Sequence, residues 1–169
     1  HHHGDHYLGN AAFKGAALIS SEMCRRMVLE TGREWLGIME RDIGRKLPGT
    51  KPLAAAVTYA EGTRTEMIVH GVRVVFSVPR GSHTVGDLLV VLPDDKVLVA
   101  GDVLVSGVVP TLQDGFVKNW IRTLDEIQAL GIAHRRGHDL DVVDPLAGLG
   151  PDVETEASHD GLLKAGGVR

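Results

Sequence analysis

The sequence predicts an α/β fold in which clustered strands form a sandwich and helices lie outside it. Segments with strand-like patterns occupy most of residues 65–100, and amphipathic helical patterns lie on either side of them. The 169 residues suffice for one domain. Hydrophobic residues make up 43% of the chain and aromatic residues only 4%, so we expect a core of aliphatic side chains. Clustered strands with peripheral helices are typical of a layered α/β sandwich.

The N-terminal part begins with polar residues and then turns helical. We expect residues 1–10 to form a loop in which a helix starts, and residues 17–20 to form a short buried strand. Helical spacing predicts a helix from Ser21 through Leu36, with Ser20 or Ser21 as its N-cap.

A second amphipathic stretch covers residues 35–46, and the Pro- and Gly-containing segment 47–52 ends it. We expect residues 37–60 to form a mobile insertion. Because loops of this kind carry substrate contacts, we place it near the mouth of a candidate substrate site.

The second half of the chain changes to a strand-like period. Four strands are predicted, and they pair as two hairpins: 65–69 with 72–78, and 87–92 with 96–100. The last two strands are almost continuously apolar, which indicates burial on both faces. A helix is predicted over residues 119–130, with four side chains toward the core: Trp120, Leu124, Ile127 and Leu130.

The first six residues bring three candidate imidazole ligands and a carboxylate together. They read His-x-His-x-Asp-His, with the candidates at His1, His3, Asp5 and His6. A purification tag also leaves histidines at a terminus, but it explains neither Asp5 and His6 nor the matching signals downstream. This density of ligands favours a site for two divalent metals over a site for one.

Three downstream signals follow in order. His83 lies in the glycine-framed turn Gly-Ser-His-Thr-Val-Gly-Asp, Asp102 closes an apolar strand in the sequence Gly-Asp, and His138 follows Gly137 after the last helix. Asp87, at the end of the turn, either caps a strand or contacts a metal ligand and fixes the orientation of its imidazole.

Together these segments resemble the metallo-β-lactamase superfamily of metal-dependent hydrolases, from His1 to about Leu130. Details such as His-His-Gly-Asp-His and Gly-Val-Val-Pro resemble the branch of sulfur-oxidation-associated and hydroxyacylglutathione-hydrolase-like proteins. The resemblance implies an αββα sandwich, in which several strands normally precede the histidine motif. We therefore expect an N-terminally truncated, partial sandwich that lacks the first strands. Residues 1–138 would be the C-terminal portion of the metallo-hydrolase domain, and residues 139–169 an irregular or disordered tail.

The resemblance also implies a set of metal ligands. The first metal would be held by His1, His3 and His83, and the second by Asp5, His6 and His138, with Asp102 bridging the two. Two Zn²⁺ ions are expected, with iron or manganese as alternatives, because imidazole and carboxylate suit all three. His138 matches the family pattern least, because Arg135 and Arg136 stand where strand-forming aliphatic residues are expected.

The implied activity is hydrolysis of an ester, thioester or lactone-like bond. A hydroxide held by one or two divalent metals would attack the bond, and Asp5 would be the catalytic residue that orients it. One alternative is β-lactam hydrolysis as in class B β-lactamases, which Asp102 counts against, because authentic β-lactamases typically lack Asp there. The other is an inactive metal-binding fragment.

The resemblance implies a small-molecule substrate, and composition argues against nucleic acid and membrane as partners. The net charge of −4 and the scattered Lys and Arg residues give no basic surface for nucleic acid. No apolar run reaches the roughly 18 residues of a membrane span, so we expect no membrane association. Cys24 is the only cysteine and is expected to be a small buried hydrophobic residue. The sequence leaves open the oligomeric state and whether the compartment is the cytoplasm or the periplasm.

Overall fold

The computed structural model describes residues 1–132, 134–138 and 141–143, the last two segments by their backbone alone. Within these residues the helices and strands are α1 (Gly4–Tyr7), η1 (Asn10–Ala12), β1 (Ile19–Ser21), α2 (Glu22–Ile43), β2 (Val57–Tyr59), β3 (Arg64–Val69), β4 (Val72–Ser77), β5 (Leu89–Leu92), β6 (Val97–Val105), α3 (Val117–Ala129), β7 (His134–His138) and β8 (Asp141–Val143). This mixture of sheets and helices confirms the predicted α/β class.

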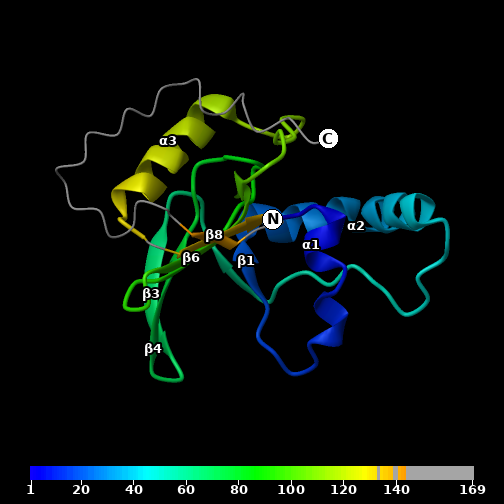
Figure 1. The fold of residues 1–169 in the computed structure, drawn as a ribbon. Helices are drawn as coiled ribbons and strands as arrows, with labels where there is room; N and C mark the ends of the chain where they lie inside the picture. The colour runs from blue at the N-terminus through cyan, green and yellow to red at the C-terminus, as the bar shows by residue number, and fades with distance from the viewer. Residues whose placement is uncertain (133, 139–140, 144–169) are drawn as a thin grey trace, which may run out of the picture.

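The strands form a large sheet of six strands and a small sheet of two. The large sheet has the order β3-β4-β5-β6-β7-β8, and the small sheet pairs β1 with β2 in parallel. The three pairings among strands β3 to β6 are antiparallel, which confirms both predicted hairpins. Strand β7 pairs with β6 in parallel, after the chain has crossed over through α3. Figure 1 shows α3 on one side of the large sheet and α1 and α2 on the other.

Two apolar clusters hold these layers together. The larger one lies between the six-stranded sheet and α3, where Leu98 is fully buried and Trp120 and Ile127 pack against the sheet. The smaller one joins α1 to α2 through Tyr7 and Cys24, with Leu8 and Val28 beside them. Cys24 is thus the buried hydrophobic residue that the sequence predicts.

Helix α2 corrects the first part of the predicted mobile insertion over residues 37–60, because residues 37–43 belong to it. The helix is continuous to Ile43, so the two predicted amphipathic stretches form one element. Its start is the predicted N-cap Ser21, whose Oγ accepts a hydrogen bond from the Cys24 backbone N–H at 3.0 Å. Its end is Gly44, in the left-handed conformation at φ 72°, which is a common helix terminator.

Burial across the large sheet also differs from the prediction. Side chains of β5 and β6 alternate between buried and more exposed positions, and Val99 is 43% exposed, so one face of this region is covered rather than both. On α3, Trp120 and Ile127 are buried as predicted, but Leu124 and Leu130 are partly exposed. Thr123 on the same helix is buried, and its hydroxyl accepts a hydrogen bond from Ser82 Oγ.

The predicted irregular tail of residues 139–169 lies largely outside the described residues. Within it, the backbone of Asp141–Val143 forms β8, which pairs antiparallel with β7 and was not predicted. Among the described helices, none combines the length and the hydrophobicity of a membrane-spanning segment.

Candidate metal centre

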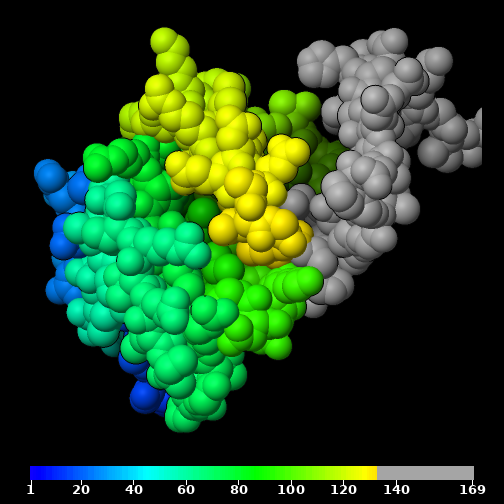
Figure 2. All heavy atoms as spheres, turned by 90° about the vertical axis from the view of Figure 1, so that its left-hand side faces the viewer, coloured from blue at the N-terminus to red at the C-terminus, as the bar shows by residue number. Residues whose placement is uncertain are grey.

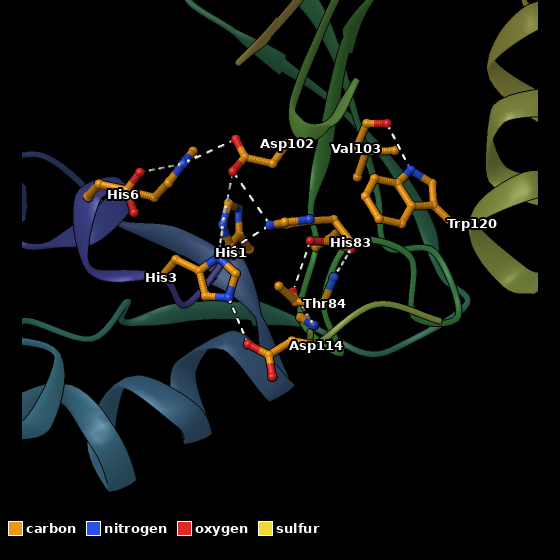
Figure 3. Close-up of polar contacts among 12 residues, drawn as sticks. His1, His3, His6, His83, Thr84, Asp102, Val103, Asp114 and Trp120 are labelled. Carbon is orange, nitrogen blue, oxygen red and sulfur yellow. Dashed lines mark hydrogen bonds and ion pairs between the residues drawn. The ribbon is translucent and has the colours of Figure 1, made fainter. Parts of the chain in front are cut away.

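Four predicted ligands meet at one point beside the end of the small sheet. Figure 3 shows His1, His3, His83 and Asp102 turned toward one another from three separate segments of the chain. One side-chain ligand atom from each of the four lies within 4.8 Å of the other three. His3 Nδ1 is 3.0 Å from His1 Nε2 and 3.2 Å from His83 Nε2. Asp102 Oδ2 is 3.7 Å from His1 Nε2 and 3.5 Å from His83 Nε2.

These separations fit the ligand shell of one tetrahedral metal ion. With Zn–N bonds of about 2.0–2.1 Å, two ligands of a tetrahedral ion lie about 3.3–3.4 Å apart. The four measured separations, 3.0, 3.2, 3.5 and 3.7 Å, bracket this value. Three imidazole nitrogens and one carboxylate oxygen are also a donor set that zinc and related divalent metals accept. The residues therefore fit a metal ion on both distance and chemistry.

The N-terminal ligands are positioned by the packing of α1 on α2. Gly4 follows His3 and lies so close to α2 that a Cβ there would come within 3.3 Å of Trp35 and 3.2 Å of Met39. The His3 ring also contacts Trp35, with ring centroids 5.1 Å apart. The glycine in the motif thus lets the chain pass against the helix with His1 and His3 directed at the centre.

His83 is carried by a tight, buried turn. The Asp87 carboxylate accepts hydrogen bonds from the backbone N–H and the hydroxyl of Thr84, both at 2.9 Å. Gly86 approaches α2 so closely that a Cβ would meet the Cys24 backbone nitrogen at 2.6 Å. Asp87 therefore acts as a cap for the turn rather than as a direct hydrogen-bond partner of His83.

Burial favours the neutral form of the His83 imidazole. Its side chain is 4% exposed, and burial holds its pKa below the usual value, with the charges of Asp87 and Asp102 opposing this. A neutral imidazole is the form that binds a metal ion. Within the described part of the chain its Nδ1 has no hydrogen-bond partner. Its orientation therefore depends on packing, including an edge-on contact with Trp120 at 5.3 Å between ring centroids.

Asp102 reaches the centre from within β6, and not from the end of the strand as predicted. The strand continues to Val105, and the pairing with β7 shifts register on both sides of Gly101. Gly101 has φ 53°, and the position of its missing Cβ lies 3.8 Å from His1 Nδ1. A β-bulge re-aims side chains, so this irregularity turns the carboxylate toward the histidines.

His6, a predicted ligand of the second metal, contacts both Asp5 and Asp102. His6 Nε2 lies 3.2 Å from Asp102 Oδ1 and 3.4 Å from Asp5 Oδ2. Burial alone would lower the pKa of His6, but hydrogen bonds to Asp102 and Asp5 outweigh it and raise the pKa to about 9. The hydrogen bond from His6 in turn lowers the pKa of Asp5. The two oxygens of Asp102 thus face different ligand sets, Oδ2 toward His1 and His83 and Oδ1 toward His6.

His138 is described by its backbone alone. It ends β7, where it pairs with Val105 of β6, three residues beyond Asp102. Arg135 and Arg136, which stand where aliphatic residues were expected, both lie within β7. The side chain of His138 lies outside the described part of the chain, so its role as a ligand stays a prediction.

Asp114 is a residue of the centre that the sequence prediction missed. Its Oδ2 is 2.9 Å from His3 Nε2, the ring nitrogen that faces away from the other ligands. A proton on Nε2 leaves Nδ1 unprotonated toward the centre. Asp114, His2 and His3 also form a second cluster of close ligand atoms, in which burial lowers the pKa of His2 to about 4. Asp114 lies in the loop before α3, outside any motif, so only its spatial position reveals it.

Comparison with known proteins gives one family match. The family model described as the metallo-beta-lactamase superfamily matches residues 1–135. Among curated proteins, none matches the chain.

Solved structures of similar fold are found in several bacterial proteins. The metallo-beta-lactamase family protein TTHA1429 from Thermus thermophilus is 24% identical, with a TM-score of 0.60 over 85% of this chain and 54% of its own. TTHA1623 in a di-iron-bound form is 20% identical, with a TM-score of 0.59 over 85% of this chain and 69% of its own. The metallo-beta-lactamase FIM-1 from Pseudomonas aeruginosa, in a mono-zinc form, is 16% identical, with a TM-score of 0.57 over 83% of this chain and 56% of its own.

The chain thus spans little more than half the length of TTHA1429 and FIM-1. Likeness at these identities shows a shared fold and leaves activity to be established from the site. Since the family model covers most of the sequence, the chain belongs to the metallo-β-lactamase superfamily.

Proposed function

We propose that the protein is a metal-dependent hydrolase that cleaves an ester, thioester or lactone-like bond. The observation that supports this most is the convergence of His1, His3, His83 and Asp102. The distances between their donor atoms bracket the spacing expected in a tetrahedral metal shell. The four residues come from segments up to about a hundred residues apart in sequence. Such a convergence of imidazoles has no evident role in stability.

The chain supplies two adjoining groups of ligands. His1, His3 and His83 would hold one metal, and Asp5, His6 and His138 a second. Asp102 suits the bridging role because its two oxygens face the two groups separately. When bound, divalent metals lower the pKa of water to about 7 and polarise the substrate carbonyl. The number and identity of the metals need direct measurement, since similar structures carry two irons in one case and one zinc in another.

Asp5 is the residue proposed to orient the attacking water. Its carboxylate is about half exposed and stays anionic, because the hydrogen bond from His6 lowers its pKa. An anionic acceptor beside the ligands can take a hydrogen bond from water and hold its lone pair toward a bound substrate. Asp5 can therefore orient the attacking water, and its contact with His6 holds the carboxylate in position.

Metal analysis combined with a substrate panel tests this proposal. The full chain, loaded with zinc, iron or manganese, is assayed for metal content and for hydrolysis of an aryl ester, an acyl thioester and a lactone. We expect bound metal and turnover of at least one of them, with both lost in His83→Ala. The matched control is His70→Asn in the exposed β3–β4 turn, where Asn tolerates the positive φ of 49°. Bound metal without turnover of any of the three bonds would refute the hydrolase assignment.

A chromogenic cephalosporin distinguishes the β-lactamase alternative. Asp102 disfavours that alternative, because authentic β-lactamases typically carry another residue at that position. We expect no efficient cephalosporin turnover. Efficient turnover of the cephalosporin with no hydrolysis of the ester, thioester or lactone would assign the site to β-lactams instead.

A further inference from the structure

A polar hollow that none of the predicted metal ligands lines lies beside α3. It has a volume of about 320 Å³ and is bordered by α3 and by the chain at the β3 and β4 ends. Figure 2 looks onto this side of the molecule, where a hollow separates α3, in yellow, from the strand residues in green and turquoise. We call it the arginine groove after the three side chains that line it: Arg64, Arg80 and Arg122.

The groove concentrates positive charge in a chain whose net charge is −4. Within the described residues, none of the three arginines lies within 4.0 Å of a carboxylate. Elsewhere, Arg26 pairs with one carboxylate and Arg73 with two. Glu126 is the one acidic residue among those that line the groove. Three guanidinium groups and one carboxylate leave an excess of two positive charges facing a solvent-accessible hollow.

Local structure holds one of these arginines in place. Gly62 has φ 75°, and the guanidinium of Arg80 lies over it so closely that a Cβ would meet Nη2 at 3.0 Å and Cζ at 3.1 Å. Asn119 Nδ2 donates to the Arg80 carbonyl oxygen at 2.6 Å, which ties this loop to α3. The Gly62 N–H also donates to the Val78 carbonyl oxygen at 2.8 Å. The glycine thus leaves room for the side chain that lines the groove.

We propose that the arginine groove binds the phosphate group of a small organic phosphate monoester. Guanidinium groups match phosphate oxygens in a bidentate way, and a phosphate monoester carries close to two negative charges at pH 7, which balances the excess. A free phosphate fills about 150 Å³, if each of its five heavy atoms takes the ~30 Å³ of a liquid water. The groove has about twice that volume, and Val78 and Pro79 give it an apolar wall for an organic substituent. The proposal does not depend on the hydrolase activity.

Isothermal titration of the full chain with phenyl phosphate and with inorganic phosphate tests this. We expect saturable binding of one phenyl phosphate per chain, tighter than that of inorganic phosphate. Arg80→Gln and Arg122→Gln should each weaken it about tenfold, the effect of losing one charged hydrogen bond. Glu126→Gln should tighten it, because it removes the opposing carboxylate. Thermal unfolding of each variant checks that the fold is retained.

The matched control is Arg33→Gln, which removes the same charge from an exposed position on α2. Arg33→Gln should bind phenyl phosphate as the unchanged chain does. If it weakens binding as much as Arg122→Gln does, the attraction is a general charge effect and the groove proposal fails. Phosphate bound at the metal centre would be insensitive to Arg122→Gln, so equal affinity in that variant also refutes the proposal. Tighter binding of inorganic phosphate would assign the groove to the free ion.

Discussion

Replacing Asp114 with Asn should weaken metal binding at the centre without removing any ligand. Asp114 Oδ2 lies 2.9 Å from His3 Nε2, so its carboxylate holds the proton on that nitrogen and leaves Nδ1 free to bind. An Asn side chain can present its amide N–H instead, which would favour the wrong tautomer of His3.

The expected loss of metal affinity depends on how exposed the side chains of Asp114 and His3 are. Loss of such a supporting hydrogen bond typically costs 10- to 100-fold in metal affinity, or about 1.4 to 2.7 kcal/mol. The side chain of Asp114 is 44% exposed and that of His3 is 13% exposed, so water replaces part of the lost contact. We therefore expect the lower end of the range, about tenfold.

Competition with a chromogenic chelator measures the affinity, and ¹⁵N chemical shifts of the imidazoles report the tautomer of His3 directly. The matched control is Asp125→Asn, which makes the same chemical change at an exposed position on α3. Equal metal affinity in Asp114→Asn and Asp125→Asn, with an unchanged His3 tautomer, would show that Asp114 does not position the ligand.

Three further predictions concern the scaffold. Leu98→Ala removes a fully buried side chain and should lower the free energy of unfolding by about 2–5 kcal/mol in urea titrations, whereas Val99→Ala, at a 43% exposed position, should cost far less. Ser21→Ala removes both the N-cap of α2 and the hydrogen bond to the Gly86 carbonyl oxygen at 2.7 Å, so the same titration should show a loss of about 2 kcal/mol. Burial raises the pKa of the Cys24 thiol, which is 6% exposed, so a disulfide reagent should label the folded chain slowly at pH 7; labelling as fast as in urea would contradict its burial.

Features encoded by short-range patterns were predictable from the sequence. The β3–β4 and β5–β6 hairpins follow from the change of period and the intervening turn residues, and the N-cap at Ser21 follows from its place before a helical pattern. The motifs also predicted that four ligands lie close together, and the structure brings these four together: His1, His3, His83 and Asp102.

Features that depend on tertiary contact were missed or misplaced. Asp102 was expected at a strand end, because the sequence does not show that β6 bends at Gly101 and then continues. Leu124 was expected in the core because it lies on the apolar stripe, but it is partly exposed, whereas Thr123 is buried and forms a hydrogen bond with Ser82. Asp114 carries no motif, and its role depends on a partner 111 residues away in sequence.

The position of His83 shows why α2 and α3, which carry no predicted ligand, should influence metal affinity. No hydrogen bond to its Nδ1 is found in the described part of the chain, so the turn that carries it must fix its direction. That turn is held from two sides: Ser21 Oγ of the α2 cap donates to the Gly86 carbonyl oxygen, and the Phe116 N–H before α3 donates to the Ser82 carbonyl oxygen at 2.8 Å. A shift of either helix therefore moves the imidazole relative to the other ligands. Because metal shells tolerate errors of only a few tenths of an ångström, we expect packing at these two helix ends to affect metal affinity.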